Sequence, residues 1–359
     1  MEPLKEMFNK AYYHQLSDAV KTIFPPFNQP AFLKEIQATF TALELNERLR
    51  LTSRQLHHYL PADYPTTLHI LKKTAEKLPS GYTAMVFPDY VSQFGLDHFE
   101  LSLEALKYFT PFGSSEFAVR VFLKKDFART LQVMLTWAED ADPHVRRLAS
   151  EGSRPRLPWS FKLDEVIKNP TSTVPILNKL KTDESLYVRK SVANHLNDFS
   201  KDHPGFLLDL VTSWDMTHPA TAWIVRHACR TLIKKGHPRA FKIFAVEQKI
   251  KVEVNHLKLT PAKLKIGDQM NFSFELVSIT HKPQKCIIDY LIHYRKKGGD
   301  LSPKVFKLKE MILQPHQSIH LSKKQHFTDL TTRRHYPGEH LLEIQINGLI
   351  KARKTFLLN

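Results

Sequence analysis

The spacing of apolar residues divides the chain into two regions of different secondary structure. Up to about residue 245, apolar residues recur at intervals of three and four, as in 30–43 and 45–60. This is the period of amphipathic helices. Proline-rich breaks at 24–26, 60–61 and 78–81 separate the segments, and proline clusters interrupt helices. We therefore predict a series of helices joined by short loops.

A short signature recurs in the second half of this helical region. The segments 118–120, 144–147, 186–190 and 223–227 each place Val-Arg early in a predicted helix. The later spacings lie near the roughly 40 residues of HEAT-type repeats. We predict a HEAT-like helical solenoid, which binds partners on its concave face. The alternative is that each Val-Arg is a packing residue followed by a solvated cation.

Beyond about residue 247 the apolar period changes to two. The segments 249–254, 271–276 and 287–294 alternate, and 304–309, 341–346 and 352–358 are further short runs rich in β-branched or aromatic residues. Such runs separated by turns predict about seven strands, enough for an immunoglobulin-like sandwich. The predicted fold is therefore mainly α: a helical solenoid domain over 1–247, followed by a small all-β sandwich over 248–359.

The charge balance narrows the class of partner. The 52 basic and 36 acidic residues give a formal net charge of +16, and 251–359 alone holds 19 basic and 9 acidic residues. A basic excess of this size favours a polyanion, with nucleic acid ahead of an anionic membrane. The N-terminal segment has no continuous apolar stretch, and no apolar run approaches the length of a membrane span. We expect a cytoplasmic protein.

The common cofactor and metal motifs are missing from the sequence. It contains no Walker loop, no dinucleotide-binding glycine fingerprint and no HExxH motif. The two cysteines, Cys229 and Cys286, are far apart and form no CxxC pair. His57-His58 is the one adjacent histidine pair, and neighbours on a helix point in different directions. We predict that the protein uses neither a metal nor an organic cofactor.

The stretch 137–159, WAEDADPHVRRLASEGSRPRLPW, carries the strongest sign of a functional site. Asp142-Pro143 predicts a helix start and Gly152 its end. Glu151 then falls in the last turn, where the helix dipole disfavours an acid. A loop with two arginines and two prolines follows and ends on Trp159. The alternatives are that Arg147, four residues earlier, simply pairs with Glu151 and that Trp159 is a core residue.

A second candidate carboxylate precedes the first Val-Arg segment. Residues 113–117, GSSEF, predict a helix start with a serine cap and Glu116 in the first turn. An acid at that position is also ordinary helix design, so the pattern alone does not decide between a structural and a catalytic Glu116.

These segments together resemble a known family. The stretches 114–120, 137–159, 168–198, 302–309 and 331–340 are similar to the DNA alkylation repair glycosylases of the AlkC type, which are relatives of the AlkD HEAT-like glycosylases. The RPRLPW segment at 154–159 is the most specific of them. The layout of a helical domain followed by an immunoglobulin-like domain is that of one subgroup.

The resemblance implies a monofunctional enzyme that hydrolyses the N-glycosidic bond of cationic N-alkylated bases, 3-methyladenine and 3-methylcytosine, in double-stranded DNA. It also implies that the base does not swing into a deep pocket, and we expect a monomer. By motif position, Glu116 and Glu151 match the active-site carboxylates and Trp159 the active-site aromatic residue.

The chemistry of the residues agrees with this expectation. A methylated base is already cationic and leaves readily, while positive charge builds on the deoxyribose; carboxylates can stabilise that charge and orient a water molecule. Basic side chains can hold phosphates. The predicted DNA-binding residues are Arg120, Arg147, Arg154, Arg156, Lys304, Lys307, Arg333 and Arg334. The alternatives are a DNA-binding HEAT scaffold without catalysis and a protein-interaction scaffold.

Overall fold

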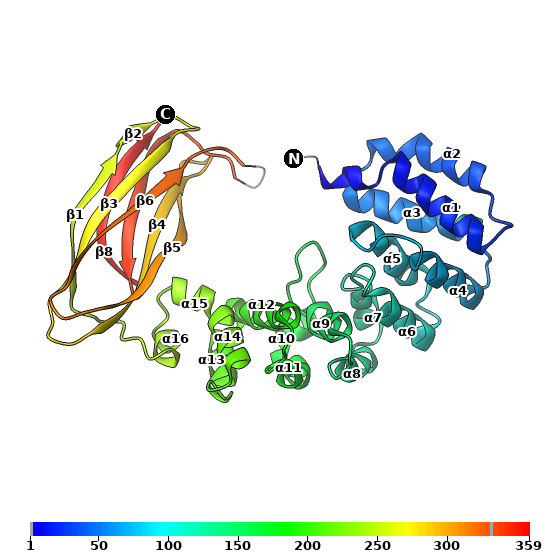
Figure 1. Cartoon of the computed structure of the whole chain (residues 1–359), viewed down its shortest axis with the longest axis horizontal. Coiled ribbons are helices and arrows are strands. Elements are labelled where there is room, and N and C mark those ends of the chain that lie inside the picture. Colours follow the sequence, from blue (N-terminus) through cyan, green and yellow to red (C-terminus); the bar gives the residue numbers. More distant parts are fainter. Residues whose placement is uncertain (1–2, 331–332) are drawn as a thin grey trace. The chain divides into compact units, whose positions relative to one another are not determined.

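The computed structural model describes residues 3–330 and 333–359. The chain divides into two compact units. The first comprises the chain up to Leu207 together with Trp214–Ala228, and the second comprises Leu208–Ser213 together with Cys229–Asn359. Helices come first along the chain and strands last (Figure 1).

The helices follow one another through short turns. They are α1 (Lys10–Ile23), α2 (Gln29–Thr39), α3 (Leu45–Tyr59), α4 (Tyr64–Ala75), α5 (Val86–Phe94), α6 (Phe99–Phe109), α7 (Val119–Lys125), α8 (Phe127–Trp137), α9 (Pro143–Gly152), α10 (Asp164–Lys168), α11 (Val174–Leu180), α12 (Leu186–Asp202), α13 (Pro204–Thr212), α14 (Pro219–Ala228), α15 (Arg230–Lys234) and α16 (Pro238–Ile243). Short 3-10 helices lie at η1 (Leu4–Met7), η2 (Phe40–Ala42), η3 (Tyr82–Met85) and η4 (Pro170–Thr173).

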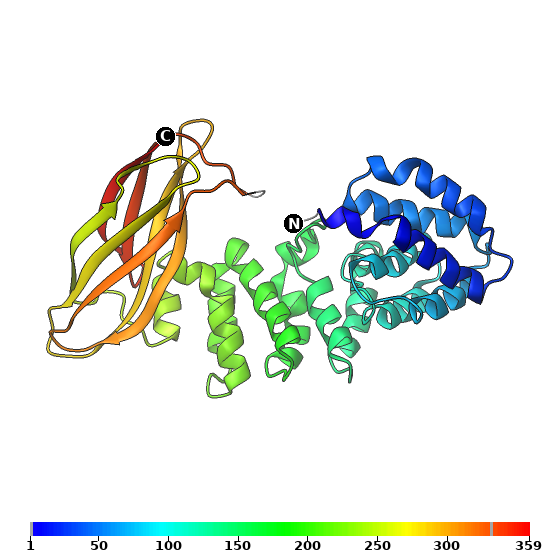
Figure 2. The same cartoon turned by 45° about the horizontal axis from the view of Figure 1, so that its top comes forward.

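The four Val-Arg segments lie on α7, α9, α12 and α14. Their valines, Val119, Val145, Val188 and Val225, are all buried. Helix α9 packs against α12, and α12 packs against α14 (Figure 2). This stacking of corresponding helices is the arrangement that a repeat spacing near 40 residues predicts.

Two of the signature arginines close the turns that precede their helices. The Arg146 guanidinium donates to the carbonyls of Asp140 and Ala141, at 2.9 Å each. Arg189 makes the equivalent bonds one repeat later, to the carbonyls of Asp183 at 3.1 Å and Glu184 at 2.8 Å. Neither arginine is therefore simply a solvated cation, because each satisfies backbone acceptors of a turn.

The strands form a two-sheet sandwich in the second unit. They are β1 (Val252–Thr260), β2 (Lys263–Leu264), β3 (Gln269–Ser278), β4 (Gln284–Arg295), β5 (Leu301–Leu313), β6 (Ser318–His326), β7 (Gly338–Ile346) and β8 (Leu349–Leu358). One sheet has the order β1-β3-β6 and the other β2-β8-β7-β4-β5. Alternate residues such as Phe272, Phe274, Ile288 and Ile344 fill the core between them. The predicted fold class, a helical solenoid followed by a small all-β sandwich, is confirmed.

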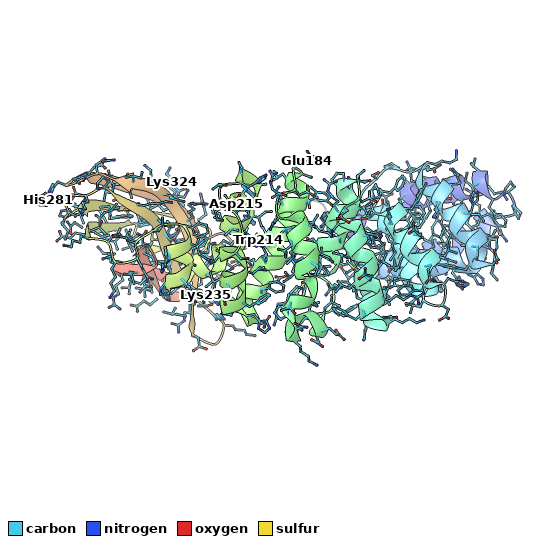
Figure 3. The ribbon with its side chains drawn as sticks, turned by 90° about the horizontal axis from the view of Figure 1, so that it is seen from below. Glu184, Trp214, Asp215, Lys235, His281 and Lys324 are labelled. Carbon is cyan, nitrogen blue, oxygen red and sulfur yellow. The ribbon has the colours of Figure 1, made fainter. Side chains whose placement is uncertain are left out.

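Strand β6 is not among the strands predicted from the sequence, which indicated no element around Lys323 and Lys324. Both residues lie on this strand, which pairs with β3 from Ser318 to His326 (Figure 3). The strand was missed because it lies at a sheet edge and is mostly exposed, with Ile319 and Leu321 as its apolar positions. Lysines on an edge strand oppose pairing with another chain.

The last helix ends at Ile243 and the first strand begins at Val252, so the predicted boundary at 247/248 falls between them. The second compact unit also includes α15 and α16, and the exact boundary stays a prediction. Among the described residues, no helix is long and apolar enough to cross a membrane.

Candidate active site

Helix α9 begins and ends where the sequence predicts. The Asp142 carboxylate accepts from the backbone N–H of His144 at 2.8 Å and caps the first turn. The helix ends at Gly152, where an added Cβ would lie 2.5 Å from Cγ1 of Val119. Glycine therefore allows α9 to approach α7 closely. Glu151 is consequently fixed in the last turn of α9, and it is buried.

Glu116 lies in a turn rather than in a helix, which corrects the predicted helix start. Helix α7 begins at Val119, three residues later. Ser115 does not cap it with its side chain, because the Ser115 hydroxyl donates to the Leu106 carbonyl at 2.7 Å. Ser114 instead donates to Oε2 of Glu116 at 2.7 Å. The turn thus holds the Glu116 carboxylate in a defined position ahead of α7.

Arg147 brings the two candidate carboxylates together. Its Nη1 lies 2.6 Å from Oε2 of Glu116, and its Nη2 lies 3.7 Å from Oε1 of Glu151. The expected pairing with Glu151 is therefore present, but the shorter contact is to Glu116. Burial acts to lower the pKa of Arg147, and the charges of Glu116 and Glu151 outweigh it, so the net shift is upward. Tyr187 supports the guanidinium from one face, 4.7 Å from the ring centroid.

A second arginine extends this arrangement into the protein. Nη1 of Arg154 lies 2.6 Å from Oε1 of Glu151, and its Nε lies 3.0 Å from Oδ2 of Asp198 on α12. Asp198, Arg154, Glu151, Arg147 and Glu116 thus form a continuous series of alternating charges, which we call the carboxylate–arginine chain. The Arg154 side chain is 9% exposed, so it is already paired and nearly inaccessible to a phosphate.

Arg120 is a structural residue. It is fully buried, and its guanidinium donates to the carbonyls of Gly152 at 2.9 Å, Arg154 at 2.6 Å and Phe161. Burial, and then the charge of Arg154, lowers the pKa of Arg120 to about 10. The prediction that Arg120 contacts DNA is wrong, because no part of its side chain reaches the surface. Arg120 instead ties together both ends of the loop that carries Trp159.

The remaining arginine of the loop is paired as well. Arg156 makes two parallel bonds to Asp202, with Nε 2.7 Å from Oδ2 and Nη2 2.6 Å from Oδ1. Its side chain is 24% exposed, so it remains a candidate for a phosphate contact through its open side.

Helix α12 supplies two site residues that the sequence analysis did not single out. Besides Asp198, it contributes His195, whose Nδ1–H donates to the Ser150 carbonyl at 3.0 Å while its Nε2 accepts from Thr173 at 3.1 Å. Burial lowers the pKa of His195 to about 3, so the ring is neutral. The position of His195 on the same helical face as Val188 and Val192 was the signal for its burial.

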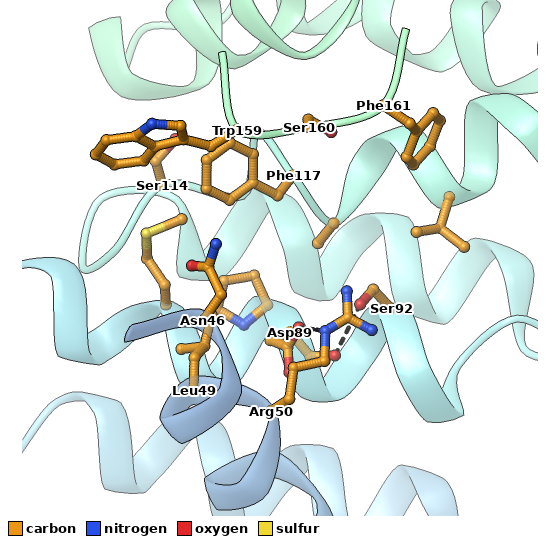
Figure 4. A pocket seen from close by; sticks show the side chains of 14 residues that line it. Asn46, Leu49, Arg50, Asp89, Ser92, Ser114, Phe117, Trp159, Ser160 and Phe161 are labelled. Atoms are coloured by element: carbon orange, nitrogen blue, oxygen red, sulfur yellow. Dashed lines mark hydrogen bonds and ion pairs between the residues drawn. The ribbon is translucent and has the colours of Figure 1, made fainter. Parts of the chain in front are cut away.

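Trp159 is a surface residue, which settles the alternatives left open by its sequence context. It is 69% exposed, and its backbone has a φ of 64°, in the left-handed region that bulky residues rarely adopt. Its side chain lines a pocket of about 170 Å³ together with Phe117, the neighbour of Glu116 (Figure 4). An exposed aromatic ring held in a strained conformation is typical of a functional position.

The candidate DNA-binding residues of the sandwich lie on and beside β5. Lys304 and Lys307 are exposed on this strand, and Lys307 pairs with Glu310 at 2.9 Å. The Arg333 guanidinium lies 4.8 Å from the Tyr294 ring centroid, and Arg334 is exposed. Burial, followed by the charges of Arg333 and Lys234, lowers the pKa of Lys304. A cationic surface is therefore present in this unit, and its contact with DNA stays a prediction.

Both the helical region and the sandwich are similar to known proteins. Residues 253–359 match the family described as the YhaZ C-terminal Ig-like domain. The chain is 43% identical over 357 residues to the uncharacterized protein YhaZ of Bacillus subtilis (strain 168), covering 99% of each chain. It is 46% identical to the alkylpurine DNA glycosylase AlkC of Pseudomonas fluorescens, solved bound to DNA containing an abasic site analog, with a TM-score of 0.98 and full coverage of both chains.

Proposed function

The chain belongs to the AlkC family of DNA glycosylases and carries its C-terminal immunoglobulin-like domain, and from this premise we propose that it removes cationic N-alkylated bases, 3-methyladenine and 3-methylcytosine, from double-stranded DNA. The similar P. fluorescens protein is described as an alkylpurine DNA glycosylase.

One observation carries the proposal: Glu116 and Glu151 are held on either side of Arg147, with the exposed Trp159 in the adjoining loop. A cationic base leaves without strong acid catalysis, and the deoxyribose left behind gains positive charge. In the proposed reaction, fixed carboxylates stabilise that charge, and one of them orients or deprotonates the attacking water. Trp159 packs against the sugar or base and excludes bulk water.

The arginines of the site have two tasks in this proposal. In the free protein they neutralise the carboxylates, because Arg147 pairs with both glutamates and Arg154 pairs with Glu151. A DNA phosphate near the lesion competes for Arg147, whose side chain is 15% exposed, and guanidinium groups bind phosphates strongly. Release of Glu116 from Arg147 then leaves negative charge available to the sugar.

The test is release of free base from a duplex that contains a single 3-methyladenine or 3-methylcytosine. We expect release by the wild-type protein and none from the unmodified duplex. The Glu151→Gln variant should bind the duplex and release base at least about 100-fold more slowly. Glu139 is an exposed acid outside the site that pairs with Lys179, so Glu139→Gln should act as the wild type does. Binding without release by the wild-type protein would instead support the DNA-binding scaffold.

A further inference from the structure

The pocket beside Trp159 has features that the proposed reaction does not use. It lies among α3, α5, the start of α7 and residues 159–161 (Figure 4). Ser114 and Phe117, which flank Glu116, both line it. The pocket therefore opens next to one of the two proposed catalytic carboxylates. We call it the Trp159 pocket.

Tyr82 contacts one of the residues that line the Trp159 pocket. The Tyr82 hydroxyl donates to Oδ1 of Asn46, a lining residue, at 2.6 Å. Burial, and then the charges of Asp89 and Glu116, raises the pKa of Tyr82. The pocket and the active-site carboxylate are contiguous through Ser114, which lines the pocket and donates to Oε2 of Glu116 at 2.7 Å.

The walls of the pocket combine aromatic faces with fixed polar groups. Trp159 and Phe117 supply rings, and the acceptor role of Asn46 Oδ1 leaves its NH₂ group as a hydrogen-bond donor. Oδ2 of Asp89 accepts from Ser53 at 2.7 Å and from Gln93 at 2.6 Å, and Nε of Arg50, which also lines the pocket, lies 3.5 Å from Oδ1 of Asp89 (Figure 4). Aromatic faces with amide and carboxylate groups around them are the means by which proteins bind single unstacked bases.

The size of the pocket limits what it can hold. Its volume is about 170 Å³, whereas an apolar protein cavity of about 150 Å³ already admits one benzene molecule. The Trp159 pocket, which opens to solvent, therefore accommodates one flat aromatic base and is too small to enclose a nucleotide with its sugar and phosphate.

We propose that the Trp159 pocket binds one unstacked nucleobase beside the cleavage site. The choice of ligand rests on the proposed function, since DNA containing an alkylated base supplies a base at this place. Two sources share this chemistry: the alkylated base after its release, and a base of the bound DNA next to the lesion. The Asn46 amide and the Arg50–Asp89 ion pair face the polar edge of the base, and Trp159 and Phe117 contact its faces.

The test fills the pocket without changing the carboxylate–arginine chain. Val121 lines the pocket and is half-buried, so Val121→Phe places a ring in the space for the base. Val133 on α8 is also half-buried and does not line the pocket, so Val133→Phe is the matched control. Asn46→Ala, at an exposed position, removes the amide with little risk to folding.

Two probes distinguish the sources. Free 3-methyladenine is titrated into each protein by equilibrium dialysis and by tryptophan fluorescence, with Trp159→Phe as the optical control. The second probe is a duplex that contains an abasic-site analogue and 2-aminopurine beside or opposite it. The fluorescence of 2-aminopurine shows whether a base of the DNA enters the pocket. For whichever probe binds, Val121→Phe should weaken the signal about tenfold or more, since single added groups discriminate to that extent. Asn46→Ala should weaken it less, and Val133→Phe should leave it within about twofold.

The outcomes separate this proposal from the proposed function. If Val121→Phe weakens the binding of free 3-methyladenine, the ligand of the pocket is the released base. If Val121→Phe weakens the 2-aminopurine signal, the ligand is a base of the DNA. If neither probe responds to Val121→Phe while the wild-type protein excises alkylated bases, the pocket proposal is wrong and the proposed function stands. Base binding by the wild-type protein without excision would support the pocket proposal and contradict the proposed enzymatic function.

Discussion

Glu116 and Glu151 acquire their proposed role through their neighbours. Each is an ordinary surface acid by residue type, but one lies in a turn fixed by Ser114 and the other in the buried last turn of α9. Arg147 contacts both. At the C-terminal end of a helix an acid opposes the dipole, and the two arginines offset that cost. The position of Glu151 is therefore maintained by a local charge balance.

Arg120 offers a prediction at the same scale. Arg120→Met removes all three hydrogen bonds to the loop ends, and hydrogen bonds from a charged group contribute about 1.5–3 kcal/mol each. Because methionine also removes the cost of burying the Arg120 charge, we expect a net loss of about 2–4 kcal/mol in the free energy of unfolding, measured by urea denaturation. Arg120→Lys should recover part of it, because a lysine can reach fewer of the carbonyls.

Arg120→Met also separates a positioning role from a phosphate contact. Because Arg120 is fully buried, the salt dependence of DNA binding by the folded variant should equal that of the wild type. A reduction in that dependence by about one unit, the value for a single phosphate-binding cation, would show that Arg120 reaches the DNA.

At the scale of elements, α12 supports the end of α9. His195 holds the Ser150 carbonyl, and Asp198 holds Arg154, which in turn contacts Glu151. Among the described residues, neither His195 nor Asp198 forms a hydrogen bond or ion pair with Glu151 itself. The position of this proposed catalytic carboxylate therefore depends on the packing of two successive repeats.

The neutral state of His195 predicts a pH-dependent stability. Its pKa is about 3 in the folded protein and about 6.5 when unfolded, so the unfolded state binds more protons between these values. The contribution of His195 is fully present above pH 6.5 and falls with decreasing pH, by about 1.4 kcal/mol per unit. Urea denaturation should show His195→Gln less stable than the wild type at pH 7.5, with the difference shrinking towards pH 5. A difference independent of pH would contradict this account.

The sequence predicted α9 closely because its start and stop signals are local. Asp142 caps the helix and Gly152 ends it, as their positions indicated. The partners of the loop arginines were not predictable in this way. Asp198 and Asp202 lie on α12, more than 40 positions along the chain from Arg154 and Arg156, and only the stacking of repeats brings them together.

Other differences have equally physical causes. Arg120 was grouped with surface cations because an arginine after a packing valine is usually solvated, yet it is buried by the loop that returns over α7. Strand β6 was missed because most of its side chains face solvent. In both cases the partner is distant in sequence: the Phe161 carbonyl for Arg120 and strand β3 for strand β6. Local patterns predicted elements and unusual residues, and long-range packing decided their roles.

At the scale of the whole molecule, the net charge of +16 favours a polyanionic partner. In the helical unit most of the arginines near the carboxylates are paired with acids. In the sandwich, Lys304 and Arg334 are exposed, so a phosphate can approach them. We infer that the sandwich supplies the more salt-sensitive part of DNA binding.

Lys304 and Arg334 should account for a measurable part of the salt dependence of DNA binding. The double variant Lys304→Ala/Arg334→Ala should lower the slope of the logarithm of DNA affinity against the logarithm of salt concentration by about two units, one for each cation that no longer neutralises a phosphate. Lys282→Ala/Arg353→Ala removes two other exposed cations of the same unit and serves as the control. Equal slopes for the two double variants would show that Lys304 and Arg334 have no special role.

The most direct test of the central claim is the single-turnover rate of base release by the two carboxylate variants. Glu151→Gln leaves Arg154 paired with Asp198, so the variant should fold, and DNA affinity measured in parallel confirms that it binds. Glu116→Gln and Glu151→Gln should each lower the rate of 3-methyladenine release by about 100-fold or more, the range found when one group that stabilises transition-state charge is removed, with binding retained. Release by both variants at the wild-type rate would contradict the proposed mechanism.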